Sequence, residues 1–212
     1  ADELQTTVIT ASTAAAPLSF AWTIPDAIGA TLKVRASDAA DATVVDTSNT
    51  NFEIKGSLTL TVPNGAEVWR VGESRGITWT KTGTIAFVKL EYSTDSGTTY
   101  PNVITASTDA TTGTYAWTVP DAIGVALRVR VTHAADAAVS DTSNANFEVK
   151  GSVTLTSPNG TEVWVVNESR NLTWTRTGTF ANVTLVYSRN AFADELQTTV
   201  ITASTAADPL PT

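Results

Sequence analysis

The sequence has 212 residues, a formal net charge of −8, a hydrophobic content of 42% and no cysteine. The lack of cysteine excludes disulfides and cysteine-based zinc sites, and the acidic balance argues against nucleic-acid binding, which requires a basic surface. No stretch approaches the roughly 18 consecutive apolar residues that a membrane-spanning helix requires.

Short stretches in which apolar and polar residues alternate run through the chain, and turn residues separate them. This period of two predicts β-strands. A clear example is residues 57–62, which end at the turn signal Pro63-Asn64-Gly65. Further strands are expected around residues 77–80, 88–92, 115–119, 127–131 and 147–149. About seven short strands per unit predict an all-β fold of tandem immunoglobulin-like or fibronectin-III-like antiparallel β-sandwiches.

An internal repeat of 95 residues organises the chain. We expect residues 56–150 to form one complete sandwich and residues 1–55 to be the C-terminal half of a preceding one. Residues 151–212 are then the N-terminal half of the next sandwich, which another copy of residues 1–55 would complete.

Residues 1–15 recur letter for letter at 193–207, after an insertion of two residues. The sequence therefore resembles a window on an array of two alternating repeat types, and two arrangements of the junction remain open. In one, separate subunits complement each other head to tail by adding strands, which propagates into a filament. In the other, the polypeptide is far longer. The duplication favours the second arrangement, because complementation needs one copy and would displace the copy at 193–207.

Three motifs carry a family resemblance: TVPNGAEVW at 61–69, ITWT at 77–80 and AWTVP at 116–120. On these motifs the unit resembles the Ser/Thr-rich immunoglobulin-like repeat of microbial surface proteins, and it is similar to the amino-terminal domain of the yeast Kre/Knh cell-wall proteins. The resemblance implies a secreted or wall-associated structural module with a sandwich fold. It implies no catalytic residues.

The only histidine, His133, aligns with Asp38 of the preceding repeat. A catalytic or metal-binding side chain is not expected to be exchanged in this way between parallel units. With no second histidine and no nucleophile motif, we expect no enzyme, no catalytic residue and no cofactor. His133 is expected on an exposed loop.

The tryptophans divide into two groups. Trp79 and Trp174 are in phase with core-facing residues, and Trp22 and Trp117 lie on mid-domain strands, so these four are predicted to pack in the core. Trp69 and Trp164 follow turns, and an exposed ring cluster there would suit a sugar-binding groove.

Five acidic residues lie before the final strands of two repeats: Asp38, Asp41, Asp46, Asp136 and Asp141. Because Ca²⁺ prefers oxygen ligands, they are weak calcium candidates between tandem domains. Their spacing matches no defined calcium loop, so we interpret them as solvated turn carboxylates and expect no metal.

The unit that starts at residue 151 differs from its predecessor. It contains four N-x-S/T sequons absent from residues 56–95, at Asn159, Asn167, Asn171 and Asn182. These are glycosylation candidates on turns or outward strand positions, and chance occurrence in a Ser/Thr-rich sequence is the alternative.

The same unit also loses charge from its non-core face. Val165 and Val186 replace Arg70 and Glu91, and the insertion brings in Phe192. Apolar residues that replace exposed charges mark contact surfaces, so we expect these three side chains at an assembly interface. The alternative is that they are scattered surface residues.

Together these patterns predict a non-enzymatic structural protein of an extracellular filament, fibre or cell-surface layer. Its expected partners are copies of itself or the continuation of a longer repeat array, with no nucleic acid and no membrane span. The alternative function is an adhesin or carbohydrate-binding surface module that contacts a cell-surface glycan.

Overall fold

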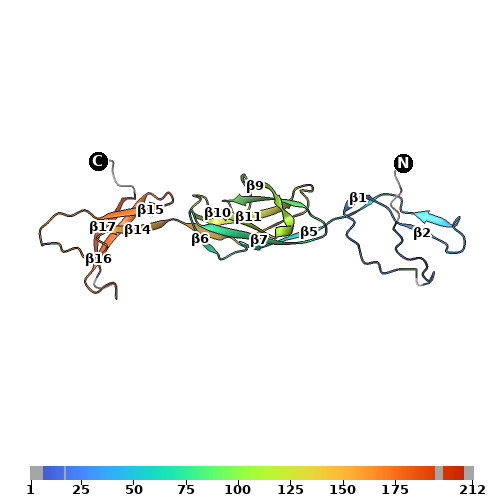
Figure 1. Cartoon of the computed structure of the whole chain (residues 1–212), viewed down its shortest axis with the longest axis horizontal. Coiled ribbons are helices and arrows are strands. Elements are labelled where there is room, and N and C mark those ends of the chain that lie inside the picture. Colours follow the sequence, from blue (N-terminus) through green and yellow to red (C-terminus); the bar gives the residue numbers. More distant parts are fainter. Residues whose placement is uncertain (1–6, 17, 194–197, 208–212) are drawn as a thin grey trace.

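The computed structural model describes residues 7–16, 18–193 and 198–207. Within them, the regular structure is β-strand apart from a single 3-10 turn, η1, at Ala110–Thr112. Figure 1 shows β-rich regions that follow one another along an elongated molecule, in the order of the sequence. The predicted all-β, sandwich-like fold is confirmed.

Residues 56–150 fold into a complete sandwich whose two sheets enclose one core. The smaller sheet has the order β10–β7–β5, formed by Thr114–Thr118, Ser74–Thr82 and Ser57–Val62. The larger sheet has the order β6–β13–β11–β8–β9, formed by Val68–Arg70, Phe147–Lys150, Gly124–His133, Phe87–Ser93 and Asn102–Asp109. A short strand, β12 (Ser140–Thr142), pairs with β11 outside this path. All of these pairs are antiparallel except β6–β13, which is parallel.

The core is built from alternate residues of these strands, because successive side chains of a strand point to opposite faces. Ile77 and Trp79 of β7 are buried, as predicted. The indole Nε1 of Trp79 donates a hydrogen bond to the Ala110 carbonyl oxygen at 3.1 Å, so the one polar atom of the ring is satisfied inside the core. Trp117 is also buried, as predicted, and packs beside Trp69 at a ring-centroid distance of 5.9 Å.

Residues 18–55 form two small two-stranded sheets. In one, β1 (Gly29–Leu32) pairs with β4 (Phe52–Ile54), and in the other, β2 (Arg35–Ser37) pairs with β3 (Val45–Thr47). Each of these Cα pairs recurs 95 residues later, where β11 pairs with β13 and β12. The N-terminal region therefore has the local pairing of the second half of the sandwich.

Residues 151–193 and 198–207 reproduce the pairings of the first half in the same way. There β14 (Ser152–Ser157) pairs with β15 (Thr173–Thr177), in the register of β5 with β7. Likewise β16 (Asn182–Ser188) pairs with β17 (Thr198–Ala206), in the register of β8 with β9.

The two copies of the duplicated segment have different structures. The later copy supplies β17, described from residue 198 onward, whereas the described part of the earlier copy, residues 7–15, contains no strand. The remaining residues of both copies lie outside the described ranges. The copy that we expected to be displaced on complementation is thus already paired with β16.

The same contact joins neighbouring regions at both boundaries. The carboxylate of Asp26 accepts hydrogen bonds from the backbone N–H of Thr84 at 3.0 Å and from its hydroxyl at 2.5 Å. Asp121 accepts the same two hydrogen bonds from Thr179, with a backbone distance of 3.0 Å. Both pairs are separated by 58 residues in sequence, so the two junctions are built alike.

Candidate functional site

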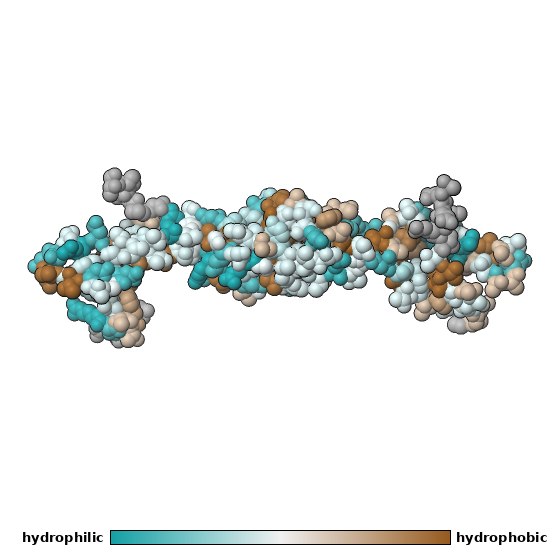
Figure 2. Space-filling view, in the orientation of Figure 1, coloured by the Kyte–Doolittle hydropathy of each residue, from teal (hydrophilic) through white to brown (hydrophobic). Residues whose placement is uncertain are grey.

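The most distinctive surfaces of the molecule are the sheet faces of its two end regions. In the central sandwich, three strand pairings join the first half to the second: β10 with β7, β11 with β8, and β13 with β6. Among the described residues, neither end region has an equivalent of these three pairings, although each reproduces the pairings inside its own half. Figure 2 accordingly shows hydrophobic surface in both end regions.

Side chains at equivalent positions of the repeat show how the missing strand pairings change burial. Leu60 is 1% exposed in the central sandwich, whereas its counterpart Leu155 is 42% exposed. Trp69 is 5% exposed, and its counterpart Trp164 is 40% exposed. Because residue type is the same within each pair, the difference comes from the strand pairings that the described C-terminal region lacks. The C-terminal region therefore presents a core-type apolar face to solvent.

An exposed ring cluster that includes Trp69 is contradicted. Strand β6 pairs in parallel with β13, and this pairing places the Trp69 ring in the core. There the ring packs against Trp117 and against Phe147, at centroid distances of 5.9 and 5.0 Å. The Trp69 ring is therefore buried among other aromatic side chains, and of the two only Trp164 presents surface for a ligand.

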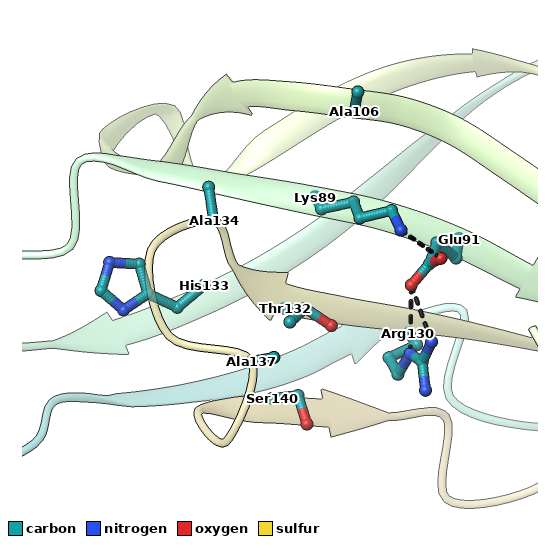
Figure 3. Close-up of a pocket in the computed structure, with 9 residues that line it drawn as sticks. All are labelled: Lys89, Glu91, Ala106, Arg130, Thr132, His133, Ala134, Ala137 and Ser140. Carbon is teal, nitrogen blue, oxygen red and sulfur yellow. Dashed lines mark hydrogen bonds and ion pairs between the residues drawn. The ribbon is translucent and has the colours of Figure 1, made fainter.

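A groove of about 260 Å3 lies on the outer face of the larger sheet, over β8 and β11 (Figure 3). One of its lining residues is Glu91, which the alternation pattern placed on the solvent side but whose side chain is only 7% exposed. Lys89 Nζ lies 2.6 Å from one carboxylate oxygen, and Arg130 Nη2 lies 2.8 Å from the other. The Arg130 guanidinium also stacks over the Tyr100 ring at 4.3 Å.

Burial raises the pKa of the Glu91 carboxyl, but hydrogen bonds from Lys89 and Arg130 and their positive charges more than offset it, so the pKa lies below its ordinary value. The carboxylate is therefore ionised at neutral pH and fully engaged by two cations. This arrangement stabilises the sheet. In the C-terminal region the counterpart of Glu91 is Val186, so the same cluster cannot form there.

Thr132 and His133, at the end of β11, also line the groove. The Thr132 hydroxyl oxygen is buried and has no hydrogen-bond partner. His133 is the last residue of β11 and is half-buried, so its predicted place on an exposed loop is wrong. The strand extends this far because the backbone of His133 is still in register with Val88 of β8.

The five calcium candidates are distributed over two regions, and four of them accept hydrogen bonds from nearby groups. Asp38 and Asp41 cap turns, with bonds from the Ala40 and Thr43 backbone N–H groups at 2.7 and 2.9 Å. Within the described ranges, no three His, Asp or Glu side chains gather in a metal-site arrangement.

Of the other three candidates, Asp136 and Asp141 lie in the central sandwich and Asp46 lies in the N-terminal region. Asp136 forms an ion pair with Lys55 at 3.0 Å, and Asp141 accepts a hydrogen bond from the Leu60 backbone N–H at 2.7 Å. Asp46, the counterpart of Asp141, lies in β3. The bond from Leu60 to Asp141 joins the two halves of the central sandwich, a role that the sequence pattern did not indicate.

The proposed interface and glycosylation residues all lie in the C-terminal region and are exposed. The interface candidates are Val165, Val186 and Phe192. The sequon asparagines are Asn159, Asn167, Asn171 and Asn182. Exposure is a requirement of both hypotheses, and both stay predictions.

A scan against protein-family models and a search of curated proteins found no match to this chain. The Kre/Knh resemblance accordingly stays a prediction that rests on its motifs. In the described part of the chain, no helix has the length and apolarity needed to cross a membrane.

Proposed function

We propose that this chain is a structural element of an extracellular filament, fibre or cell-surface layer, in which immunoglobulin-like sandwiches follow one another in a line. The observation that carries the proposal is the repeated junction, Asp26 with Thr84 and Asp121 with Thr179. A contact that recurs at a fixed offset gives each boundary the same geometry, as in repeat proteins whose units contact only their neighbours.

Close packing beside these contacts supports a defined junction. Gly83 and Gly178 have φ angles of 84° and 90°, a region that favours glycine. A Cβ atom would lie 3.0 Å from Ile28 Cδ1 at the first junction and 2.9 Å from Ile123 Cδ1 at the second. At both junctions, therefore, the glycine backbone lies against the side chain of an equivalent isoleucine, and the two boundaries are packed alike.

Composition supports an extracellular location. Only 16% of the residues are charged, and the chain is rich in Ser and Thr. Four sequons lie on one unit, and their asparagines are exposed. Together with the resemblance to microbial surface repeats, these features suit a surface protein.

Immunogold labelling of intact source cells tests the proposal. An antibody raised against the full chain is expected to label filaments or a layer outside the cell without permeabilisation. A signal that appears only after permeabilisation would contradict the extracellular location. A preimmune serum and cells that lack the protein are the matched controls.

An adhesin or carbohydrate-binding module is the second candidate, and the exposed ring of Trp164 favours it, because aromatic faces stack on sugars. Its test is a glycan array probed with the full chain and with the Trp164→Ala variant. The matched control is Val163→Ala, which removes a neighbouring exposed side chain. Binding that only Trp164→Ala abolishes supports this candidate, and no binding by the full chain contradicts it.

A further inference from the structure

We propose that residues 18–55 of one copy of this chain bind the C-terminal region (residues 151–193 and 198–207) of a second copy, and that together they form a sandwich with the architecture of the central one. The inference rests on the proposed structural role and names its partner, a second copy. Its starting point is that the two end regions hold complementary halves, each with the internal pairings that it has in the central domain.

The central sandwich supplies the register of the new interface. There Tyr115 of β10 lies opposite Ile77 of β7, and Thr132 of β11 lies opposite Lys89 of β8. Shifted by 95 residues, these pairs become Phe20 with Leu172 and Ser37 with Thr184. The parallel pair Val149 with Trp69 becomes Ile54 with Trp164. Every strand pairing that the end regions lack thus has both of its partners in this chain.

Aromatic packing is divided between the two ends in the same way. In the central core, Trp69 contacts both Trp117 and Phe147. The N-terminal region retains counterparts of the last two rings, Trp22 and Phe52, in contact at 6.3 Å. The counterpart of the first ring is Trp164, 40% exposed at the other end of the chain. Complementation would place Trp164 against Trp22 and Phe52 and complete the cluster.

Three hydrogen bonds between the halves have both partners conserved between repeats. In the central domain, the Leu60 N–H donates to Asp141 at 2.7 Å, the Ser143 hydroxyl donates to the Pro63 carbonyl at 2.8 Å, and the Asn144 N–H donates to Asn64 at 2.7 Å. The corresponding residues are Leu155 with Asp46, Pro158 with Ser48, and Asn159 with Asn49. These groups give the interface polar specificity as well as apolar area.

The arrangement of the chain favours a second copy over closure within one copy. The central sandwich lies between the two end regions (Figure 1), so residues 18–55 and 151–207 of one chain are held apart. The two surfaces also differ from each other. A contact of this heterologous kind does not close on itself in pairs, and it propagates head to tail into a linear assembly.

One feature of the central domain is not reproduced. Arg35 corresponds to Arg130, but the residue opposite it would be Val186 in place of Glu91. The interface therefore lacks the central ion pair and depends on apolar contacts, backbone hydrogen bonds and the side-chain hydrogen bonds of Asp46, Ser48 and Asn159. Salt is consequently expected to weaken the assembly little, because screening acts mainly on exposed charges.

Disulfide trapping in the full chain tests the register, and the lack of native cysteine gives a clean background. The double variant Ser37→Cys, Thr184→Cys places two thiols on directly opposed residues of the proposed interface, within reach of a disulfide. Mild oxidation is expected to give a ladder of bands at multiples of 22.2 kDa on non-reducing gels. The matched control is Ser37→Cys with Val183→Cys, which puts the two thiols on opposite faces of the sheet. It is expected to give disulfide-linked dimers at most and none of the higher bands.

Adding Leu155→Arg to the double variant is expected to abolish the ladder, while NMR spectra of the central domain show that it stays folded. The inference is overturned if the double variant remains monomeric, or if the control pair forms the same ladder. Surface labelling of cells without a ladder would leave the proposed function standing and point to a longer continuous chain. A ladder without surface labelling would support binding between copies and contradict the extracellular location.

Discussion

Strands β5 and β7 of the central sandwich and strands β14 and β15 of the C-terminal region pair in the same register, yet only the first pair faces a closed core. The comparison separates two levels of folding. Pairing between neighbours in sequence is set by alternation and turns and survives without the rest of the domain. Burial depends on the strands of the second half, which lie far along the sequence or on another chain.

This difference gives the C-terminal face a thermodynamic reason to find a partner. Burying apolar surface contributes about 25 cal/mol per Å2, so an exposed core-type face is unfavourable in water. Bare strand edges add unpaired backbone groups that readily accept another strand. The central domain buries its apolar face between two sheets, whereas the described part of each end region leaves its apolar face open and lacks the three pairings between halves.

The largest predicted effect is at matched leucines. Leu60→Ala is expected to lower the free energy of unfolding of the central domain by about 2–5 kcal/mol, because it leaves a cavity in a closed core. Leu155→Ala is expected to change stability by about 0.5 kcal/mol in the dilute, unassembled chain. Denaturant unfolding at low protein concentration measures both. Equal losses would show that the two faces are packed alike.

A second comparison concerns Glu91 and Val186. Glu91→Val is expected to destabilise the central domain by about 1.5–3 kcal/mol, because it removes charge-assisted hydrogen bonds to Lys89 and Arg130. The reciprocal change, Val186→Glu, alters an exposed residue and should change stability by about 0.5 kcal/mol. Chemical denaturation of both variants checks the prediction, and an unchanged Glu91→Val protein would contradict a stabilising cluster.

At the junction, Gly178→Ala is expected to strain a residue with positive φ by about 1–2 kcal/mol and to displace Ile123. The strain should change the orientation of the C-terminal region relative to the central domain while leaving the central fold intact. Residual dipolar couplings measure this orientation. Gly160→Ala is the matched control, because a Cβ there meets no atom closer than 3.9 Å. Similar couplings in both variants would count against a tight junction.

The smallest effect expected is a pH dependence of the same junction. Hydrogen bonds from the Thr179 hydroxyl and backbone lower the pKa of Asp121 from its ordinary value of 3.8. Since the folded state has the lower pKa, the contact is at full strength above the ordinary value and is lost as the pH falls through the lowered one. Small-angle scattering should therefore detect added flexibility only below about pH 4. Because Asp26 makes the same contact and its pKa is lowered in the same way, only the double variant Asp26→Asn, Asp121→Asn should lack this transition.

Much of the fold could be predicted from the sequence, because strand alternation is a local signal. The strand at Ser57–Val62 and the buried faces of β7 and β11 appear where the pattern placed them. Strand pairings recur between the regions at the 95-residue offset of the repeat, with β17 shifted further by the two-residue insertion.

The remaining features depend on contacts between distant residues. Glu91 is buried because Lys89 and Arg130 neutralise it across strands, and alternation alone assigned it to solvent. Trp69 is buried because β6 joins β13 in parallel, a pairing with no local signature. The Asp121–Thr179 junction spans 58 residues, and only its recurrence at Asp26–Thr84 makes it visible as a pattern.

The parallel pairing of β6 with β13 also determines how a sandwich of this kind responds to mechanical force. Tension along the molecule enters the central domain at β5 and leaves it at the end of β13, beside Gly151. Pulling on β13 slides it along β6, so the backbone hydrogen bonds between them are loaded together in shear. In a complemented domain the same clamp would join residues 53–55 of one chain to residues 163–165 of another. A connection made without covalent bonds would then resist extension with the strand geometry that protects the continuous domain.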